Sequence, residues 1–218
     1  MVMVTPLPQR SRLRRLVGGV RRAFRLLGRV LLAIVLLTAV ASCFGILQTN
    51  VIRPAPPPVI NDVTQLNPIV VSEIITPTTT EEIIAAVRRH TGPISIGGGR
   101  YSMGGQTATS GALQIDMRQM NRIVAFSPAE KWITVQAGAR WRQIQEQIDS
   151  ADLSIKIMQT YSNFTVGGSL SVNVHGRYVG LGPLVLSVRG IRIVLADGTV
   201  VDASPVVHPD IFYGAIGG

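Results

Sequence analysis

The clearest pattern in the chain is an unbroken apolar run at positions 30–47, which follows a strongly basic segment. The run has 18 residues and no charge, and a helix needs roughly 20 apolar residues to cross the hydrocarbon core of a bilayer. Because basic residues stay on the cytoplasmic side of a span, the pattern predicts a single-pass helix with a cytoplasmic N-terminus and an extracytoplasmic, periplasmic domain. Positions 1–29 carry no acidic residue but eight arginines: Arg10, Arg12, Arg14, Arg15, Arg21, Arg22, Arg25 and Arg29.

Several interpretations of this membrane segment stay open. The first is an uncleaved signal anchor. The second is a lipoprotein signal, because Cys43 follows Val40-Ala41-Ser42 as in a bacterial lipobox. The third is a twin-arginine export signal, which the motif at 21–24 resembles and which is compatible with either of the others. A buried core helix is the fourth, and the preceding arginines disfavour it.

The net charge of +9 is concentrated in the basic segment. Of the 21 basic residues eight lie before position 30, which leaves 13 against all 12 acidic ones, so the rest of the chain is nearly neutral. Because nucleic-acid binding needs a basic surface on the folded domain, we expect no nucleic-acid partner, and membrane lipid instead. Cys43 is the only cysteine, which excludes an internal disulfide and a multi-cysteine metal site, and we expect no metal.

Prolines at positions 54 and 56–58 follow the apolar run and favour an extended, semi-rigid spacer. The predicted organisation is therefore a basic cytoplasmic tail at 1–29, a transmembrane or signal-anchor helix at 30–47, a linker at 48–65 and a folded domain at 66–218.

Within the domain the pattern alternates between helix and strand periods, which predicts a mixed α and β fold. Threonines at 78–80 with Glu81 and Glu82 are typical of a helix N-terminus, and the apolar positions that follow predict a helix ending near His90. A second helix is predicted at 141–148. Strands are expected at 94–96, at 113–117, on both sides of the turn at 127–130, and in a hairpin at 191–203 around Asp197-Gly198.

The first glycine-rich segment covers positions 96–106, with the sequence IGGGRYSMGGQ. Its five glycines permit a close approach of the backbone to a ligand, and successive amides in such a loop bind anions. Ser102 and Gln106 add neutral donors. Arg100 adds a charge for a phosphate or for a carboxylate inside the protein. The spacing matches neither a Rossmann fingerprint nor a P-loop.

The second segment, at 161–177, has the sequence YSNFTVGGSLSVNVHGR. We expect it to be a loop in which Thr165, Ser169 and Ser171 present hydroxyl donors to one ligand. Gly167 and Gly168 would leave room for a flat ring or a diphosphate. The imidazole of His175 is a candidate base, ligand or packed side chain, and a packed side chain is the more common role.

Five segments in order resemble a known family: IGGGRYSMGGQ, LQIDMRQMN, VQAGARW, TVGGSLSVNVHGR and VLADGTVVDAS, followed by HPDIFYGAIGG. Residues 66–218 are similar to FAD-linked oxidases of the vanillyl-alcohol oxidase and PCMH type. That group includes cytokinin dehydrogenases, sugar-lactone and alditol oxidases, and decaprenylphosphoryl-ribose oxidases. The resemblance implies an α+β fold, namely a PCMH-type FAD-binding domain of two small α/β subdomains, here preceded by the transmembrane helix.

The resemblance also implies where FAD binds. The first segment would wrap the diphosphate, the second would run along the diphosphate and the isoalloxazine edge, and the strand containing Val194 would contact the adenine side. Many relatives carry, just before the serine of the first segment, a histidine that bonds covalently to the flavin. Tyr101 stands there in this chain, so we expect non-covalent FAD. The implied cofactor-binding residues are Gly97, Gly98, Gly99, Arg100, Tyr101, Ser102, Gln106, Thr165, Gly167, Gly168, Ser169, Ser171, His175 and Val194.

Family members oxidise a carbon that bears a hydroxyl or amine by passing a hydride to flavin N5, while a protein base takes the proton. The base and the substrate pocket usually come from a cap domain that follows the FAD-binding part. We expect this chain to be C-terminally incomplete, with the cap on a separate chain as one option, and no catalytic base, substrate or electron acceptor is predicted. The alternative expectation is a membrane-anchored, non-catalytic pseudoenzyme or interaction module.

Overall fold

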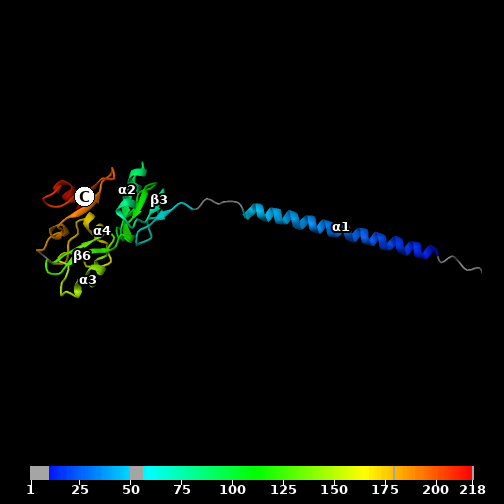
Figure 1. Ribbon diagram of the computed structural model, residues 1–218, viewed down its shortest axis with the longest axis horizontal. Helices are drawn as coiled ribbons and strands as arrows, with labels where there is room; N and C mark the ends of the chain where they lie inside the picture. The colour runs from blue at the N-terminus through cyan, green and yellow to red at the C-terminus, as the bar shows by residue number, and fades with distance from the viewer. Residues whose placement is uncertain (1–9, 50–55, 179, 218) are drawn as a thin grey trace, which may run out of the picture. The chain divides into compact units, whose positions relative to one another are not determined.

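The computed structural model describes residues 10–49, 56–178 and 180–217 (Figure 1). The chain forms two compact units, Met1–Ala55 and Pro56–Gly218. The prolines at 54 and 56 therefore flank the boundary, and the part of the predicted linker at 50–55 lies outside the described residues.

The first unit contains one helix, α1 (Arg10–Thr49) (Figure 1). It begins well before the predicted span at 30–47, because no proline interrupts positions 10–49 and leucine, arginine and alanine all favour a helix. Phe24–Ser42, 19 residues, is long and apolar enough to cross a membrane by length and composition, criteria that a signal sequence also meets. The side chain of Cys43, on which the lipobox interpretation depends, lies outside the described ones.

The second unit begins earlier than predicted. Strand β1 (Val59–Ile60) pairs antiparallel with β2 (Ile69–Val70), and Ile60 and Asp62 are buried. Residues 59–65, expected in the linker, are therefore part of the folded unit. Two-residue strands are too short to produce a periodic pattern, which explains why the sequence did not reveal them.

A parallel sheet forms the first half of this unit. Its strand order is β3 (Glu73–Ile75), β5 (Leu113–Asp116), β4 (Ile94–Gly97). Helix α2 (Thr80–Arg89) packs on one face, where Ala86 meets Leu113 and Ile115. The predicted N-terminus of α2 is confirmed, because the Thr79 hydroxyl accepts the Glu82 amide at 3.3 Å. All four residues of β5 are buried, so its two polar side chains lie inside the protein.

The second half begins after the short 3-10 helix η1 (Met117–Gln119). Strands β6 (Ile123–Ser127) and β7 (Trp132–Val135) pair antiparallel, as predicted. Helices α3 (Trp141–Asp149), α4 (Val166–Ser171) and η2 (Leu184–Ser187) follow. Their shared core contains Trp141, Ile144, Ile148, Ile157 and Leu184.

The hairpin predicted at 191–203 is present as β8 (Ile191–Val194) and β9 (Val200–Ala203), followed by α5 (Pro209–Ala215). Its turn contacts the end of α2, where Arg88 donates to the carbonyls of Asp197 and Gly198 at 3.4 and 3.3 Å. This contact joins the two halves of the unit, whose overall class is α+β as expected.

Candidate functional site

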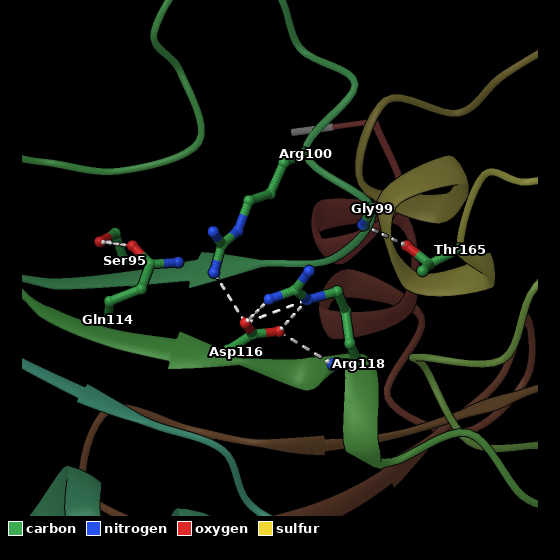
Figure 2. A network of polar contacts seen from close by, with 7 residues as sticks. All are labelled: Ser95, Gly99, Arg100, Gln114, Asp116, Arg118 and Thr165. Carbon is green, nitrogen blue, oxygen red and sulfur yellow. Dashed lines mark hydrogen bonds and ion pairs between the residues drawn. The ribbon is translucent and has the colours of Figure 1, made fainter. Parts of the chain in front are cut away.

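The first glycine segment leaves the parallel sheet at Gly97, which lies beside Asp116 of β5. It then passes Thr165, whose hydroxyl accepts a hydrogen bond from the Gly99 amide at 3.4 Å (Figure 2). A β-carbon added to Gly98 would lie only 2.2 Å from that hydroxyl oxygen. The two glycine segments, 66 residues apart in sequence, are thus in contact, and Gly98 cannot carry a side chain without moving one of them.

The Arg100 side chain turns toward the sheet and binds Asp116 (Figure 2). Its Nη2 lies 2.7 Å from Asp116 Oδ2, and Arg118 binds the same carboxylate at 2.5 Å. Of the two partners that the sequence allowed for Arg100, the structure therefore shows the internal carboxylate. Burial of Asp116, 2% exposed, opposes its ionisation, but the hydrogen bonds and charges of Arg118 and Arg100 outweigh this and lower its pKa.

Tyr101 belongs to an aromatic cluster with two residues of the second segment. Its ring lies edge-on to Tyr161 and Phe164, with centroids 5.3 and 4.8 Å away. The Asn163 amide donates to the Tyr161 hydroxyl at 3.1 Å, and this bond, with a second from Tyr101, lowers the pKa of Tyr161. The cluster is a second contact between the glycine segments, beside the one at Thr165.

The middle of the first segment faces outward. Ser102 and Met103 are exposed, and Tyr101 is half-buried. Among the described residues, none accepts a hydrogen bond from the backbone amides of these three positions. Because amide donors need an acceptor and consecutive loop amides suit anions, this stretch fits a diphosphate. The Gln106 side chain folds back within the segment and accepts the Gly104 amide at 2.8 Å.

The second segment is not the loop that the sequence predicted. Thr165 is the N-cap of helix α4, and Gly167 to Ser171 lie within that helix. Thr165 and Ser169 are buried, and the Ser169 hydroxyl binds Trp141 Nε1, Gln159 Oε1 and the Thr165 carbonyl at 2.9, 2.7 and 2.9 Å. The expectation that three hydroxyls point at one ligand is therefore wrong: helical periodicity turns Ser169 inward and leaves only Ser171 exposed.

His175 lies in a wall of an open cavity of about 660 Å³, which is lined by residues 159–161, by Phe164 and by residues 172–177. Its imidazole is exposed, with Nδ1 3.1 Å from the Gly176 carbonyl. Tyr161 and Phe164 of the aromatic cluster also line the cavity. Val194, assigned to the adenine side, is half-buried on β8 opposite Val200. The structure thus brings the first segment into contact with Thr165 and Phe164. His175 lies apart from this contact in the cavity wall, and Val194 lies on β8.

Comparison with known proteins adds a family match. Residues 71–204 match a family whose members contain an FAD binding domain. The chain belongs to this family. Both glycine segments fall inside the match, which implies the PCMH-type FAD-binding fold for this part of the chain.

Individual relatives carry the names of oxidases and dehydrogenases. The chain is 29% identical to L-gulonolactone oxidase of Mus musculus over 62% of this chain and 30% of the relative. It is 28% identical to cytokinin dehydrogenase 2 of Arabidopsis thaliana over 66% and 30%, respectively. It is also 28% identical to decaprenylphosphoryl-β-D-ribose oxidase of Mycolicibacterium smegmatis over 68% and 34%. The chain spans about a third of the length of the curated relatives it matches.

Several residues of the site were not singled out from the sequence as site residues. Arg118 shares the carboxylate of Asp116 with Arg100. Asn163 donates a hydrogen bond to Tyr161 of the aromatic cluster. Asn67 donates to the Met103 carbonyl at 3.2 Å from 36 positions earlier in the chain. Asp116 also accepts the Arg118 amide at 3.2 Å, so it ties down the backbone as well. No local pattern marks the other three.

Proposed function

We propose that this chain is the FAD-binding part of a membrane-anchored oxidoreductase that oxidises a hydroxyl-bearing carbon of a sugar-like or alcohol substrate. The observation that carries the proposal is the run of backbone amides at 101–103, which have no acceptor among the described residues. The run follows Gly98 and Gly99, which lie against Thr165. Membership of the family supplies the cofactor identity, and the names of the relatives support the class of substrate.

The residues present fit FAD in a defined division of roles. The amides of Tyr101 and Ser102, with the Ser102 hydroxyl, would hold the diphosphate as neutral donors, while Gly97 to Gly99 let the backbone approach closely. Gly167, Gly168 and Ser171 would let α4 form a further wall, and Gln106 and Val194 would contact the cofactor from the first segment and from β8. Thr165, Ser169 and Arg100 would act by packing and positioning. Bound FAD would supply the hydride acceptor, its N5 atom.

The cavity beside His175 is the proposed place for the reacting end of the cofactor. Its walls combine the aromatic rings of Tyr161 and Phe164 with the exposed imidazole of His175. The lining also includes the polar side chains of Gln159, Asn173 and Arg177, and apolar walls with placed polar groups are typical of ligand pockets. His175 would orient the flavin or the substrate there by hydrogen bonding. A cap domain, on this or a separate chain, would supply the remaining walls and the base.

Non-covalent attachment of FAD is part of the proposal. Tyr101 occupies the position of the linking histidine in the family resemblance, and its ring packs against Tyr161 and Phe164. Tyrosine has no imidazole nitrogen, so it does not form the histidyl bond to flavin. Flavin should therefore leave the protein fully on acid precipitation, and fluorescence of a denaturing gel band under ultraviolet light would contradict this.

Helix α1 is the proposed membrane anchor, with the N-terminus cytoplasmic and the FAD-binding unit outside. With 3.6 residues per turn, Arg21, Arg22, Arg25 and Arg29 fall within an arc of about 100°, which suits contact with anionic headgroups. Carbonate-washed membranes should retain the full chain, and external protease should digest the FAD-binding unit in intact spheroplasts. Release by carbonate, or protection from external protease, would refute the anchor or its orientation, respectively.

The cofactor proposal can be tested with one glycine pair. Gly98→Ala places a methyl group 2.2 Å from Thr165 Oγ1, whereas an added β-carbon at Gly214 meets nothing within 4 Å. In the detergent-solubilised full chain we expect Gly98→Ala to weaken FAD binding by more than about tenfold, equal to about 1.4 kcal/mol. Gly214→Ala should bind as the wild type does. FAD fluorescence titration measures both, and equal binding by the two variants would contradict the site.

A further inference from the structure

Two buried aspartates, one on each side, hold the exposed stretch of the first glycine segment. On one side Arg100 reaches Asp116 at 2.7 Å. On the other, Asn67 joins Asp62 to the segment: its amide lies 2.8 Å from Asp62 Oδ2 and 3.2 Å from the Met103 carbonyl. Asp62 and Asp116 are 1% and 2% exposed, so both anchors are fixed in the protein interior.

Arg100 has a backbone conformation that arginine rarely adopts. Its φ is +60°, in the left-handed region, where a side chain crowds the backbone. Its carbonyl accepts the Val63 amide at 3.0 Å, and its guanidinium binds Asp116, so contacts at both ends of the residue hold this conformation. The amides of Tyr101, Ser102 and Met103 follow immediately after it.

Arg118 provides a natural comparison within the same ion cluster. It donates to both Asp116 oxygens, with Nε at 2.8 and 3.0 Å, but belongs to η1 rather than to the glycine segment. The two arginines therefore neutralise one carboxylate, and only Arg100 connects that carboxylate to the amides at 101–103.

We propose that Arg100 is a positioning residue, which uses buried Asp116 to fix the amides of 101–103 in their anion-binding arrangement before FAD arrives. This inference rests on the proposed cofactor site. Without the anchor, the cofactor would have to order the segment itself, which lowers affinity. Arg118 keeps the carboxylate charged and does not order the segment.

The test compares Arg100→Ala with Arg118→Ala in the detergent-solubilised full chain. Both variants remove one partner of Asp116 and are expected to lower thermal stability. Arg100→Ala should raise the Kd for FAD about tenfold or more, whereas Arg118→Ala should change it less than about threefold. Arg100→Lys, which restores a charge toward Asp116, should recover part of the affinity. Equal effects of the two alanine variants on the Kd would overturn the proposal.

A second measurement decides the matter without the cofactor. Amide hydrogen exchange in peptides covering 99–104 of the FAD-free chain should accelerate in Arg100→Ala and stay at the wild-type rate in Arg118→Ala. Arg100→Gly, which tolerates positive φ and so keeps the fold, should accelerate it too, because the anchor and not the φ angle orders the segment. Unchanged exchange in both Arg100 variants would overturn the proposal. A wild-type chain that binds no FAD would refute the proposed function, while exchange still tests the anchor.

Discussion

The two glycine segments are alike in composition and opposite in construction. The first leaves its amides at 101–103 without an acceptor among the described residues and its Ser102 exposed. The second is folded into α4, and its Thr165 and Ser169 are buried with their hydroxyls hydrogen-bonded inside the protein. Glycine and small hydroxyl residues therefore have two roles here. The first segment leaves hydrogen-bond donors free, and the second segment packs beneath the first and supports it.

The largest expected effect concerns Trp141, which lies in the core beneath α4 and the second segment. Trp141 is buried and donates to Ser169 Oγ and Gln159 Oε1 at 2.9 and 3.0 Å. Trp141→Ala should destabilise the FAD-binding unit by about 3–5 kcal/mol through the cavity it leaves, measured by urea unfolding of the full chain. Trp132→Ala, at a half-buried position on β7, should cost markedly less. Equal costs would mean that the core beneath α4 does not carry the second segment.

Asp116→Asn should have the next largest effect, because it leaves Arg100 and Arg118 without their shared anion. We expect a loss of about 2–3 kcal/mol, below the cost typical of fully buried pairs since Arg118 is 46% exposed. Asp202→Asn, at a surface pair with Arg192, is the control and should cost markedly less, because exposed ion pairs add little to stability. If both variants unfold at the same urea concentration, the buried cluster has no special role.

The same carboxylate predicts a pH dependence. The pKa of Asp116 is lower in the folded protein than its ordinary value, so its contribution to stability is present above about pH 4 and is lost as the pH falls through the folded pKa. The wild type should therefore lose more stability between pH 7 and pH 3 than Asp116→Asn does. Parallel pH profiles of the urea midpoint would show that folding does not lower the pKa of Asp116.

How far the sequence could anticipate the structure depended on the range of the interactions. The helix α2 and the hairpin β8–β9 were predicted because capping residues and an Asp-Gly turn act locally. Helix α4 was missed because Gly167 and Gly168 disfavour a helix on their own, and packing against Ala137 and Ala139 overrides that preference: their carbonyls accept the Gly167 and Val166 amides at 2.8 Å.

The candidate site shows the same limit. Its glycines could be singled out because close backbone approach leaves a compositional signal, and the structure shows such an approach where Gly98 and Gly99 meet Thr165. The partner of Arg100 could not be chosen between a phosphate and a carboxylate, because that choice depends on the register that places Gly97 beside Asp116. The inward turn of Ser169 likewise follows from the helical period of α4, which the sequence did not reveal.

A moderate effect on stability alone is expected for Ser169→Ala. It removes the shared partner of Trp141 and Gln159 and should cost about 1–2 kcal/mol, with the Kd for FAD within about twofold. Ser171→Ala, whose exposed hydroxyl donates to the Gly168 carbonyl at 2.9 Å, is the matched control and should cost less. A tenfold weaker affinity for FAD in Ser169→Ala, measured by fluorescence titration, would show that this hydroxyl reaches the cofactor.

The smallest expected change in stability is at Ser102 of the first glycine segment. Ser102→Ala removes an exposed hydroxyl and should alter the free energy of unfolding by less than about 0.5 kcal/mol. Its Kd for FAD should nevertheless rise about tenfold to a hundredfold, the value of one hydrogen bond to a charged group. A loss of stability without a loss of affinity would reverse the roles assigned to the two segments.

The central claim is that the first segment presents donors to a non-covalently held FAD. Its most direct test is the visible absorbance spectrum of the full chain, purified in detergent with FAD and then desalted. We expect a retained flavin spectrum that disappears from the protein fraction after acid precipitation, and a colourless Gly98→Ala variant. A folded wild-type chain that stays colourless, or a flavin spectrum unaffected by Gly98→Ala, would contradict it.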